Sequence, residues 1–207
     1  MLPTAAGKRV FKPFLNEETI DAPGIGAVDQ SRGPADPEED EMDEAEMAAW
    51  MKYASPNQNH DFLKKLEGKW NCKTKFWMQP GGDPAESTGT AENKMALDGR
   101  FLHCNYSGNM MGQPFLGMSI DGFDNQKQKY VGVWIDTMGT MILQFEGTCD
   151  GTVREMIAEY QCPMTNTQKK TKGVTTVVGD NEHRYEGFNL GPDGEFFKNL
   201  EVVYTRQ

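Results

Sequence analysis

Alternation between apolar and polar residues dominates the chain from residue 69 to its end. In the stretch WNCKTKF, which begins at Trp70, every second residue is apolar or small and the residues between them are polar. A period of two is typical of a strand that buries one face. Turn sequences such as LDGR, FDNQKQK and CDGT separate ten such segments. We predict strands at residues 69–78, 86–96, 101–108, 114–122, 129–136, 140–148, 153–161, 169–178, 183–190 and 196–205.

The predicted strands follow one another with no helix-length segment between them. Parallel strands need a long crossover connection, so the sheet is expected to be an antiparallel meander. An open meander leaves two unpaired edges that invite aggregation, and closure into a cylinder removes them. We therefore predict an all-β fold. It is a ten-stranded antiparallel up-and-down barrel at residues 55–207, with a short helix before its first strand and an extended N-terminal arm.

Three segments of different composition precede the first strand. Residues 1–36 are punctuated by proline and glycine and show no apolar periodicity, which predicts an extended or disordered arm. Residues 37–54 combine an acidic start with apolar residues at helical spacing, which predicts an acidic amphipathic helix. A second, short helix is predicted around Phe62–Leu66, and Gly68 is expected just past its end as a left-handed residue.

The side chains expected inside the barrel are mostly aromatic or sulfur-containing. Nine methionines fall within residues 68–207. Such an interior fits either a solid core or a cavity that holds one small ligand. The small residues Gly117, Ser119 and Gly132 favour a cavity, because they leave space beside large neighbours. The candidate ligand-binding residues are Phe76, Phe101, His103, Phe115, Tyr130, Trp134, Asp136, Phe145 and Tyr160.

Closing the barrel requires that the first strand pair with the last and that the end of the cylinder be filled. Trp70 stands two residues after Gly68 and is expected to point inward and fill that end. Arg206 ends the last predicted strand, where its guanidinium can stack on the indole and its N–H groups can bind nearby carbonyls. These three residues are therefore predicted to close the barrel. A G-x-W on the first strand with an arginine on the last resembles the signature of the lipocalin and calycin superfamily.

The middle of the chain resembles a more specific family. The blocks MMGQPF and KYVGVWID, with LDGRFL before them and VVYTR after them, resemble the bacterial lipocalin-like family known as domain of unknown function 1579. The resemblance covers about residues 60–207 and implies a calycin-type barrel with no agreed activity. Phe123 stands where members often have tyrosine. The residues that carry the resemblance are Gly68, Trp70, Gly99, Arg100, Met111, Gly112, Phe115, Gly122, Asp124, Tyr130, Trp134, Asp136, Gly147 and Tyr204.

Three carboxylates are the first candidates for chemistry. Asp121, Asp124 and Asp136 cluster around the fourth and fifth predicted strands, where a hairpin would bring Asp121 near Lys129 or Tyr130. Asp124 is typical of a residue that caps a turn through side-chain hydrogen bonds. Asp136 shares a face with aromatic residues, and a carboxylate that points inward must be paired or protonated. We interpret Asp136 as a polar anchor in a pocket.

No metal or cofactor site is predicted. The calycin resemblance brings nitrobindin-like haem barrels to mind, in which a histidine reaches the iron, and His103 is the candidate by its place on a strand. No surrounding pattern orients that histidine, and the cysteines and histidines lack zinc spacing. G-x-S-x-G, phosphate-loop and H-E-x-x-H motifs are absent too. We predict no catalytic residue, and nothing in the sequence argues for an enzyme.

Charge is unevenly distributed along the chain. Residues 1–50 contain twelve acids and four bases, and residues 51–207 contain nineteen acids and seventeen bases. An acidic arm on a nearly neutral body does not suit nucleic acid or an anionic membrane surface, both of which need a basic face. No segment reaches the roughly 20 apolar residues needed to span a bilayer, and the basic start lacks the apolar segment of a secretory signal. A cytoplasmic location is expected.

The four cysteines are expected to be reduced thiols. Cys149 and Cys162 flank a predicted hairpin at opposite ends of a strand, so they would lie on the order of 30 Å apart. A disulfide tolerates a Cα separation of roughly 4.4–6.8 Å.

Two functional hypotheses follow from these patterns. In the first, the barrel binds a small, mainly apolar ligand in its interior without catalysis. In the second, the protein is an interaction or assembly subunit that docks on a larger complex, or on another copy of itself, through residues 1–50.

Overall fold

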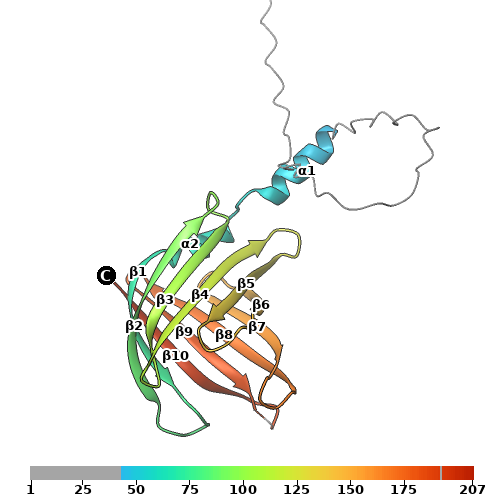
Figure 1. Cartoon of the computed structure of the whole chain (residues 1–207). Helices are drawn as coiled ribbons and strands as arrows, with labels where there is room; N and C mark the ends of the chain where they lie inside the picture. Colours follow the sequence, from blue (N-terminus) through green and yellow to red (C-terminus); the bar gives the residue numbers. More distant parts are fainter. Residues whose placement is uncertain (1–42, 192) are drawn as a thin grey trace, which may run out of the picture. The chain divides into compact units, whose positions relative to one another are not determined.

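The computed structural model describes residues 43–191 and 193–207. The ten strands close into one antiparallel barrel in which every strand pairs with its neighbours in sequence and the first pairs with the last (Figure 1). The predicted ten-stranded up-and-down barrel is confirmed. In chain order the elements are α1 (Glu44–Ala54), α2 (His60–Lys65), β1 (Gly68–Phe76), β2 (Ala85–Ala96), β3 (Phe101–Met110), β4 (Gln113–Asp124), β5 (Lys129–Asp136), β6 (Leu143–Cys149), β7 (Val153–Gln161), β8 (Gln168–Gly179), β9 (Glu182–Leu190) and β10 (Phe196–Arg206).

The barrel closes where β1 meets β10. The two strands pair in an antiparallel register that runs from Trp70 opposite Arg206 to Phe76 opposite Leu200. Along β1 the inward residues are buried, and the lysines between them face solvent. The period of two that predicted a strand is therefore also what gives the cylinder an apolar inside and a charged outside.

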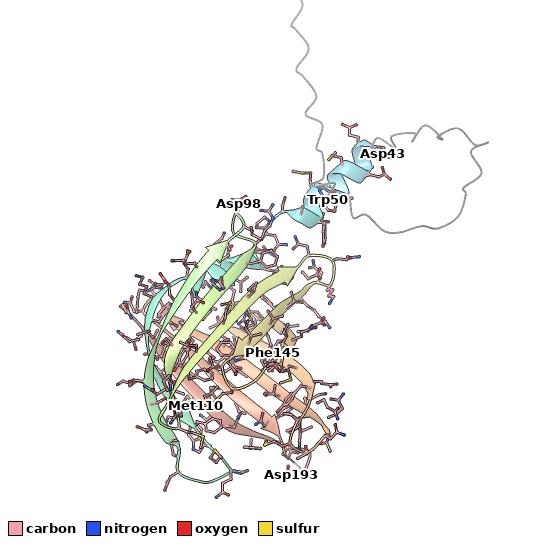
Figure 2. All side chains as sticks on the ribbon, viewed as in Figure 1. Asp43, Trp50, Asp98, Met110, Phe145 and Asp193 are labelled. Atoms are coloured by element: carbon pink, nitrogen blue, oxygen red, sulfur yellow. The ribbon has the colours of Figure 1, made fainter. Side chains whose placement is uncertain are left out.

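The two ends of the barrel differ. Helix α2 covers one end, which we call the floor, and buries Phe62, Leu63 and Leu66 against Leu102 and Met156. Figure 2 shows Asp98 at the floor end and Met110 and Asp193 at the other end, which we call the mouth. The mouth is formed by the strand connections at residues 77–84, 111–112, 137–142, 162–167, and 191 and 193–195.

Helix α1 has a well-defined start. The carboxylate of Asp43 accepts a hydrogen bond from the backbone N–H of Glu46, and the Glu46 carboxylate accepts one from the N–H of Asp43, at 2.8 and 2.9 Å. This capping box begins the helix at residue 44. Of the predicted acidic helix, residues 37–42 lie outside the described residues, and so does the predicted arm at residues 1–36.

Gly68 has a different role from the expected one. Helix α2 ends with Leu66 as its C-cap, in a right-handed conformation with φ −86° and ψ −7°. Gly68 is instead the first residue of β1, with φ +137°. That backbone conformation is open almost exclusively to glycine. A Cβ at this position would also overlap the guanidinium of Arg206. The glycine is therefore required by the closure of the barrel and not by the end of the helix.

Replacing Gly68 should destabilise the barrel through both effects. We expect Gly68→Ala to lower the free energy of unfolding by about 2–3 kcal/mol, because the backbone and Arg206 must both shift. Gly112→Ala is the matched control. Gly112 also has a positive φ, +79°, but no atom lies within 4 Å of the added Cβ. The control should lose about 1 kcal/mol. Urea unfolding measures both values, and equal losses would contradict the proposed contact with Arg206.

Candidate functional site

The barrel interior holds a cavity of about 1060 Å³. It extends from Leu66 and His183 at the floor to Met111 and Met138 at the mouth. Pockets that bind small molecules usually measure about 300–1,000 Å³. The sequence fitted either a solid core or a cavity. The interior contains a cavity, and its volume is large enough for a small molecule.

Aromatic rings form much of the cavity wall. The rings of Tyr106 and Phe115 meet edge to face with their centroids 5.9 Å apart. The rings of Phe115 and Trp134 are stacked, with centroids 6.5 Å apart and planes 21° from parallel. The indole N–H of Trp134 donates to the Asp136 carboxylate at 2.7 Å, and that carboxylate also accepts from the backbone N–H of Met138 at 2.8 Å. Asp136 thus fixes the indole near the mouth.

Glycines allow these rings to lie against the wall. A Cβ on Gly117 would overlap the ring of Trp134, and a Cβ on Gly173 would lie 2.7 Å from the Tyr185 hydroxyl oxygen. Each ring therefore covers a neighbouring strand where that strand has no side chain. This arrangement keeps large residues out of the centre of the barrel and preserves the cavity.

A buried ion pair crosses the lower part of the cavity. Arg154 Nη1 donates to Asp121 Oδ1 at 2.9 Å, and the hydroxyl of Ser119 donates to Asp121 Oδ2 at 2.8 Å. All three residues line the cavity. A Cβ on Gly132 would lie 2.8 Å from Asp121 Oδ1, so the small residue on β5 makes room for the carboxylate.

The guanidinium of Arg154 has unused hydrogen-bonding capacity. Arg154 is 7% exposed, and its Cζ lies 5.6 Å from the centre of the Phe62 ring and 6.0 Å from that of Tyr130. Its Nε is buried and has no hydrogen-bond partner among the described residues. The other described side-chain atoms that are buried without a hydrogen-bond partner belong to Asn93, His183 and Asn199. All four residues line the cavity, so the unsatisfied polar atoms gather where a ligand would bind.

His183 is a buried histidine at the floor. Its ring stacks on Tyr204 with centroids 4.2 Å apart and meets the Trp70 ring edge-on at 4.4 Å. Burial, with a smaller contribution from the charges of Arg206 and Arg154, lowers the pKa of His183 from 6.5 to about 3. The imidazole is therefore neutral at neutral pH.

Two cysteines and a tyrosine of the interior are also uncharged at neutral pH. Burial raises the pKa of the Cys72 and Cys104 thiols to about 12, and it raises the pKa of Tyr185 to about 12. A thiol must lose its proton to act as a nucleophile, so these cysteines are inert. All four cysteines are free thiols, as predicted. In the described part of the chain, no three His, Cys, Asp or Glu side chains are grouped to hold a metal ion.

Most of the candidate ligand-binding residues lie together. The candidates that line the cavity are Phe76, Phe115, Trp134, Asp136, Phe145 and Tyr160. Tyr130 is buried in the floor, where its hydroxyl donates to the backbone carbonyl of Asn59 at 2.6 Å. The labelled Phe145 lies on the barrel between the floor and the mouth (Figure 2).

Phe101 and His103 do not reach the cavity, which corrects their expected inward orientation. The buried residues of β3 are Leu102, Cys104 and Tyr106, and side chains alternate along a strand. Phe101 and His103 therefore lie on the outer face. The position weighed for a haem ligand is outside the barrel.

Sequence reasoning missed Arg154 as the partner of Asp121. It placed Asp121 near Lys129 or Tyr130, whereas the carboxylate reaches across the barrel from β4 to β7. Arg154 does share the inward phase of Met156 on β7. The inward position of this arginine is the feature from which the sequence could have indicated a buried partner of opposite charge. Asp124 caps the next turn, as the sequence indicated, by accepting from the backbone N–H groups of residues 126 and 127.

A family match is consistent with this geometry. The family DUF1579, described as a protein of unknown function, matches residues 55–206. The chain belongs to the DUF1579 family. The predicted family is thus confirmed, and the match spans α2 and nearly all of the barrel. No match is found among curated proteins.

Solved structures show the same fold at low sequence identity. Rv2717c from M. tuberculosis is 16% identical, with a TM-score of 0.54 over 74% of this DUF1579 chain and 99% of that chain. A redesigned beta barrel, b11L5F_LGL, is 15% identical, with a TM-score of 0.39 over 70% and 94% of the two chains. EF1p2_mFAP2b bound to DFHBI is 13% identical, with a TM-score of 0.40 over 72% and 98%. The first likeness concerns the fold alone, and the scores of the other two are too low to inform function.

Neither helix in residues 43–191 and 193–207 has the length and apolar character needed to cross a bilayer.

The buried histidine should make stability depend on pH. His183 binds a proton near pH 6.5 in the unfolded chain and only near pH 3 in the folded chain. Its contribution to the free energy of unfolding is therefore full above pH 6.5 and is lost as the pH is lowered toward 3. We expect His183→Phe, which keeps the ring packing, to reduce this slope by up to about 1.4 kcal/mol per pH unit. Urea unfolding between pH 7.5 and about 5 measures it. His103→Gln, on the outer face, is the control, and an unchanged slope in His183→Phe would contradict the burial of a neutral ring.

Proposed function

We propose that this DUF1579 barrel binds one small, mainly apolar molecule in its cavity and does not transform it chemically. The observation that supports the proposal is the cavity of about 1060 Å³, whose wall carries many aromatic rings and in which Asp121, Arg154 and Asp136 are held by hydrogen bonds. The inert thiols and the neutral histidine argue against covalent or acid–base chemistry at the floor.

Burial of apolar surface is the proposed source of affinity. Removing roughly 300 Å² of ligand surface from water contributes about 7.5 kcal/mol at 25 cal/mol per Å². Part of this gain is lost to the entropy of association. Because the rings of Trp134, Tyr106 and Tyr185 already lie against glycines, these rings need little further ordering on binding. The proposed contacts are Phe76, Phe115, Trp134, Phe145 and Tyr160, with Asp136 as a polar anchor at the mouth.

Exposed methionines at the mouth suit the passage of such a ligand. Four of the strand connections there carry one or more of them, and the residues are Met78, Met111, Met138, Met141 and Met164. A methionine side chain is flexible and polarisable, so it adapts to irregular apolar shapes. We propose that the ligand enters and leaves between these side chains.

The second hypothesis concerned docking through residues 1–50. Most of that segment lies outside the described residues, so this hypothesis stays a prediction. In the described part, α1 exposes Met47, Trp50 and Met51.

Filling the cavity should abolish binding without unfolding the barrel. The test uses the apolar fluorescent probe N-phenyl-1-naphthylamine, with native mass spectrometry to establish one molecule per chain. We expect the double variant Leu143→Trp/Thr171→Trp, which enlarges two cavity-lining residues, to bind the probe at least about tenfold more weakly than wild type.

The matched control changes the residues next to these two. Gln144→Trp/Lys170→Trp introduces the same side chains on the same strands, at positions that alternate to the outer face. The control should bind the probe like wild type, and circular dichroism should show both variants folded. Absence of probe binding by wild type, or equal binding by the two variants, would overturn the proposed function.

A further inference from the structure

We propose that the ligand is an uncharged molecule with a carbonyl-type acceptor, and that this acceptor binds Nε of Arg154 at the floor of the cavity. The inference rests on the proposed function and names the ligand class that the same site selects. An ester, a ketone, an aldehyde or an amide on an apolar body supplies this chemistry.

The unsatisfied donor is the Nε–H group of Arg154. Arginine has five N–H groups, and Asp121 binds one of them, on Nη1. The Nε–H of Arg154 is buried beside the cavity without an acceptor among the described residues. A buried donor without a partner is unfavourable, and an acceptor on a ligand removes this cost. The guanidinium is held in place by Asp121 and by the rings of Phe62 and Tyr130, so it is already oriented.

The charges that line the cavity disfavour an anionic ligand. Among the described residues that line the cavity, Arg154 is the one lysine or arginine, whereas Glu86, Asp121 and Asp136 are acidic. The charge of Arg154 is already compensated by Asp121 at 2.9 Å. His183 is neutral and supplies no second cation. A ligand carboxylate would therefore bring an unpaired negative charge into a buried site, which is strongly unfavourable.

The hydrogen bonds of Asp121 disfavour a cationic ligand at the floor. Both carboxylate oxygens of Asp121 are engaged, Oδ1 by Arg154 and Oδ2 by Ser119. An ammonium group placed there would compete with Arg154 for Asp121 and leave the guanidinium unpaired. A neutral acceptor is the group that satisfies Nε without disturbing the pair.

Three probes of one shape test the headgroup. 2-Acetylnaphthalene carries a carbonyl, 2-ethylnaphthalene replaces it with a methylene, and 2-naphthoate carries a charge. We expect wild type to bind the acetyl compound about tenfold more tightly than the ethyl compound, because one hydrogen bond to a charged donor is gained. The naphthoate should bind most weakly. Displacement of N-phenyl-1-naphthylamine measures all three affinities.

A paired variant removes the donor without leaving a charge behind. Arg154→Met/Asp121→Leu replaces the ion pair with apolar side chains of similar size, a change that buried pairs often tolerate. We expect the preference for acetyl over ethyl to fall to about one, while the ethyl compound keeps its affinity. Lys170→Met/Glu159→Leu is the control, since it removes an ion pair of 2.7 Å between β7 and β8 that does not line the cavity, and it should keep the preference.

The outcomes separate this inference from the proposed function. If none of the three compounds binds wild type, the proposed function fails and the inference with it. If the ethyl compound binds as tightly as the acetyl compound, or if naphthoate binds most tightly, the inference alone fails. It fails as well if the paired variant keeps the preference for the acetyl compound.

Discussion

The pairing of β1 with β10 around Trp70 is the constraint on which the rest of the structure depends. Trp70 is fully buried, and its indole N–H donates to the carbonyl of Leu66 at 3.0 Å. The guanidinium of Arg206 lies 4.2 Å from the indole centre and donates to the carbonyls of Glu67 and Asp180 at 3.0 and 2.8 Å. One side chain at the end of the last strand thus joins the start of the first strand to the β8–β9 turn. An open sheet would have neither a floor nor an enclosed cavity.

The ion pair inside the barrel is a consequence of this closure. Asp121 on β4 and Arg154 on β7 are separated by two strands, so they meet across the interior and not along the sheet. Burying two charges costs several kcal/mol per ion, and an apolar pair of similar size is often as stable or more so. Stability alone therefore gives little reason for the pair. The functional reason we propose is that the pair holds a hydrogen-bond donor rigidly at the floor of the cavity.

Local patterns predicted the elements of this fold better than their roles. The strands are clear because each alternates with a period of two, whereas Gly68 satisfied the rule for a helix end and in fact serves the strand start. On β3 the alternation of Leu102, Cys104 and Tyr106 marks the inner face, but Phe101 is a large apolar residue on the other face at the start of the strand, and it was assigned to the wrong one. Arg154 was overlooked because its partner is 33 residues away and reaches it through space. Such a contact is defined only by the closed barrel.

The cavity also depends on where the aromatic rings lie. Rings that pointed to the centre of a ten-stranded barrel would fill it, but here Trp134 lies over Gly117 and Tyr185 over Gly173, while the Tyr106 hydroxyl binds Thr74 at 3.0 Å. A stability argument would favour a filled interior, since packed rings gain dispersion energy and an empty volume does not. A wall of rings over glycines forgoes that gain. The space it leaves is lined by these rings and carries an unsatisfied, charge-compensated donor at its base, which is the arrangement on which our proposal of a neutral ligand rests.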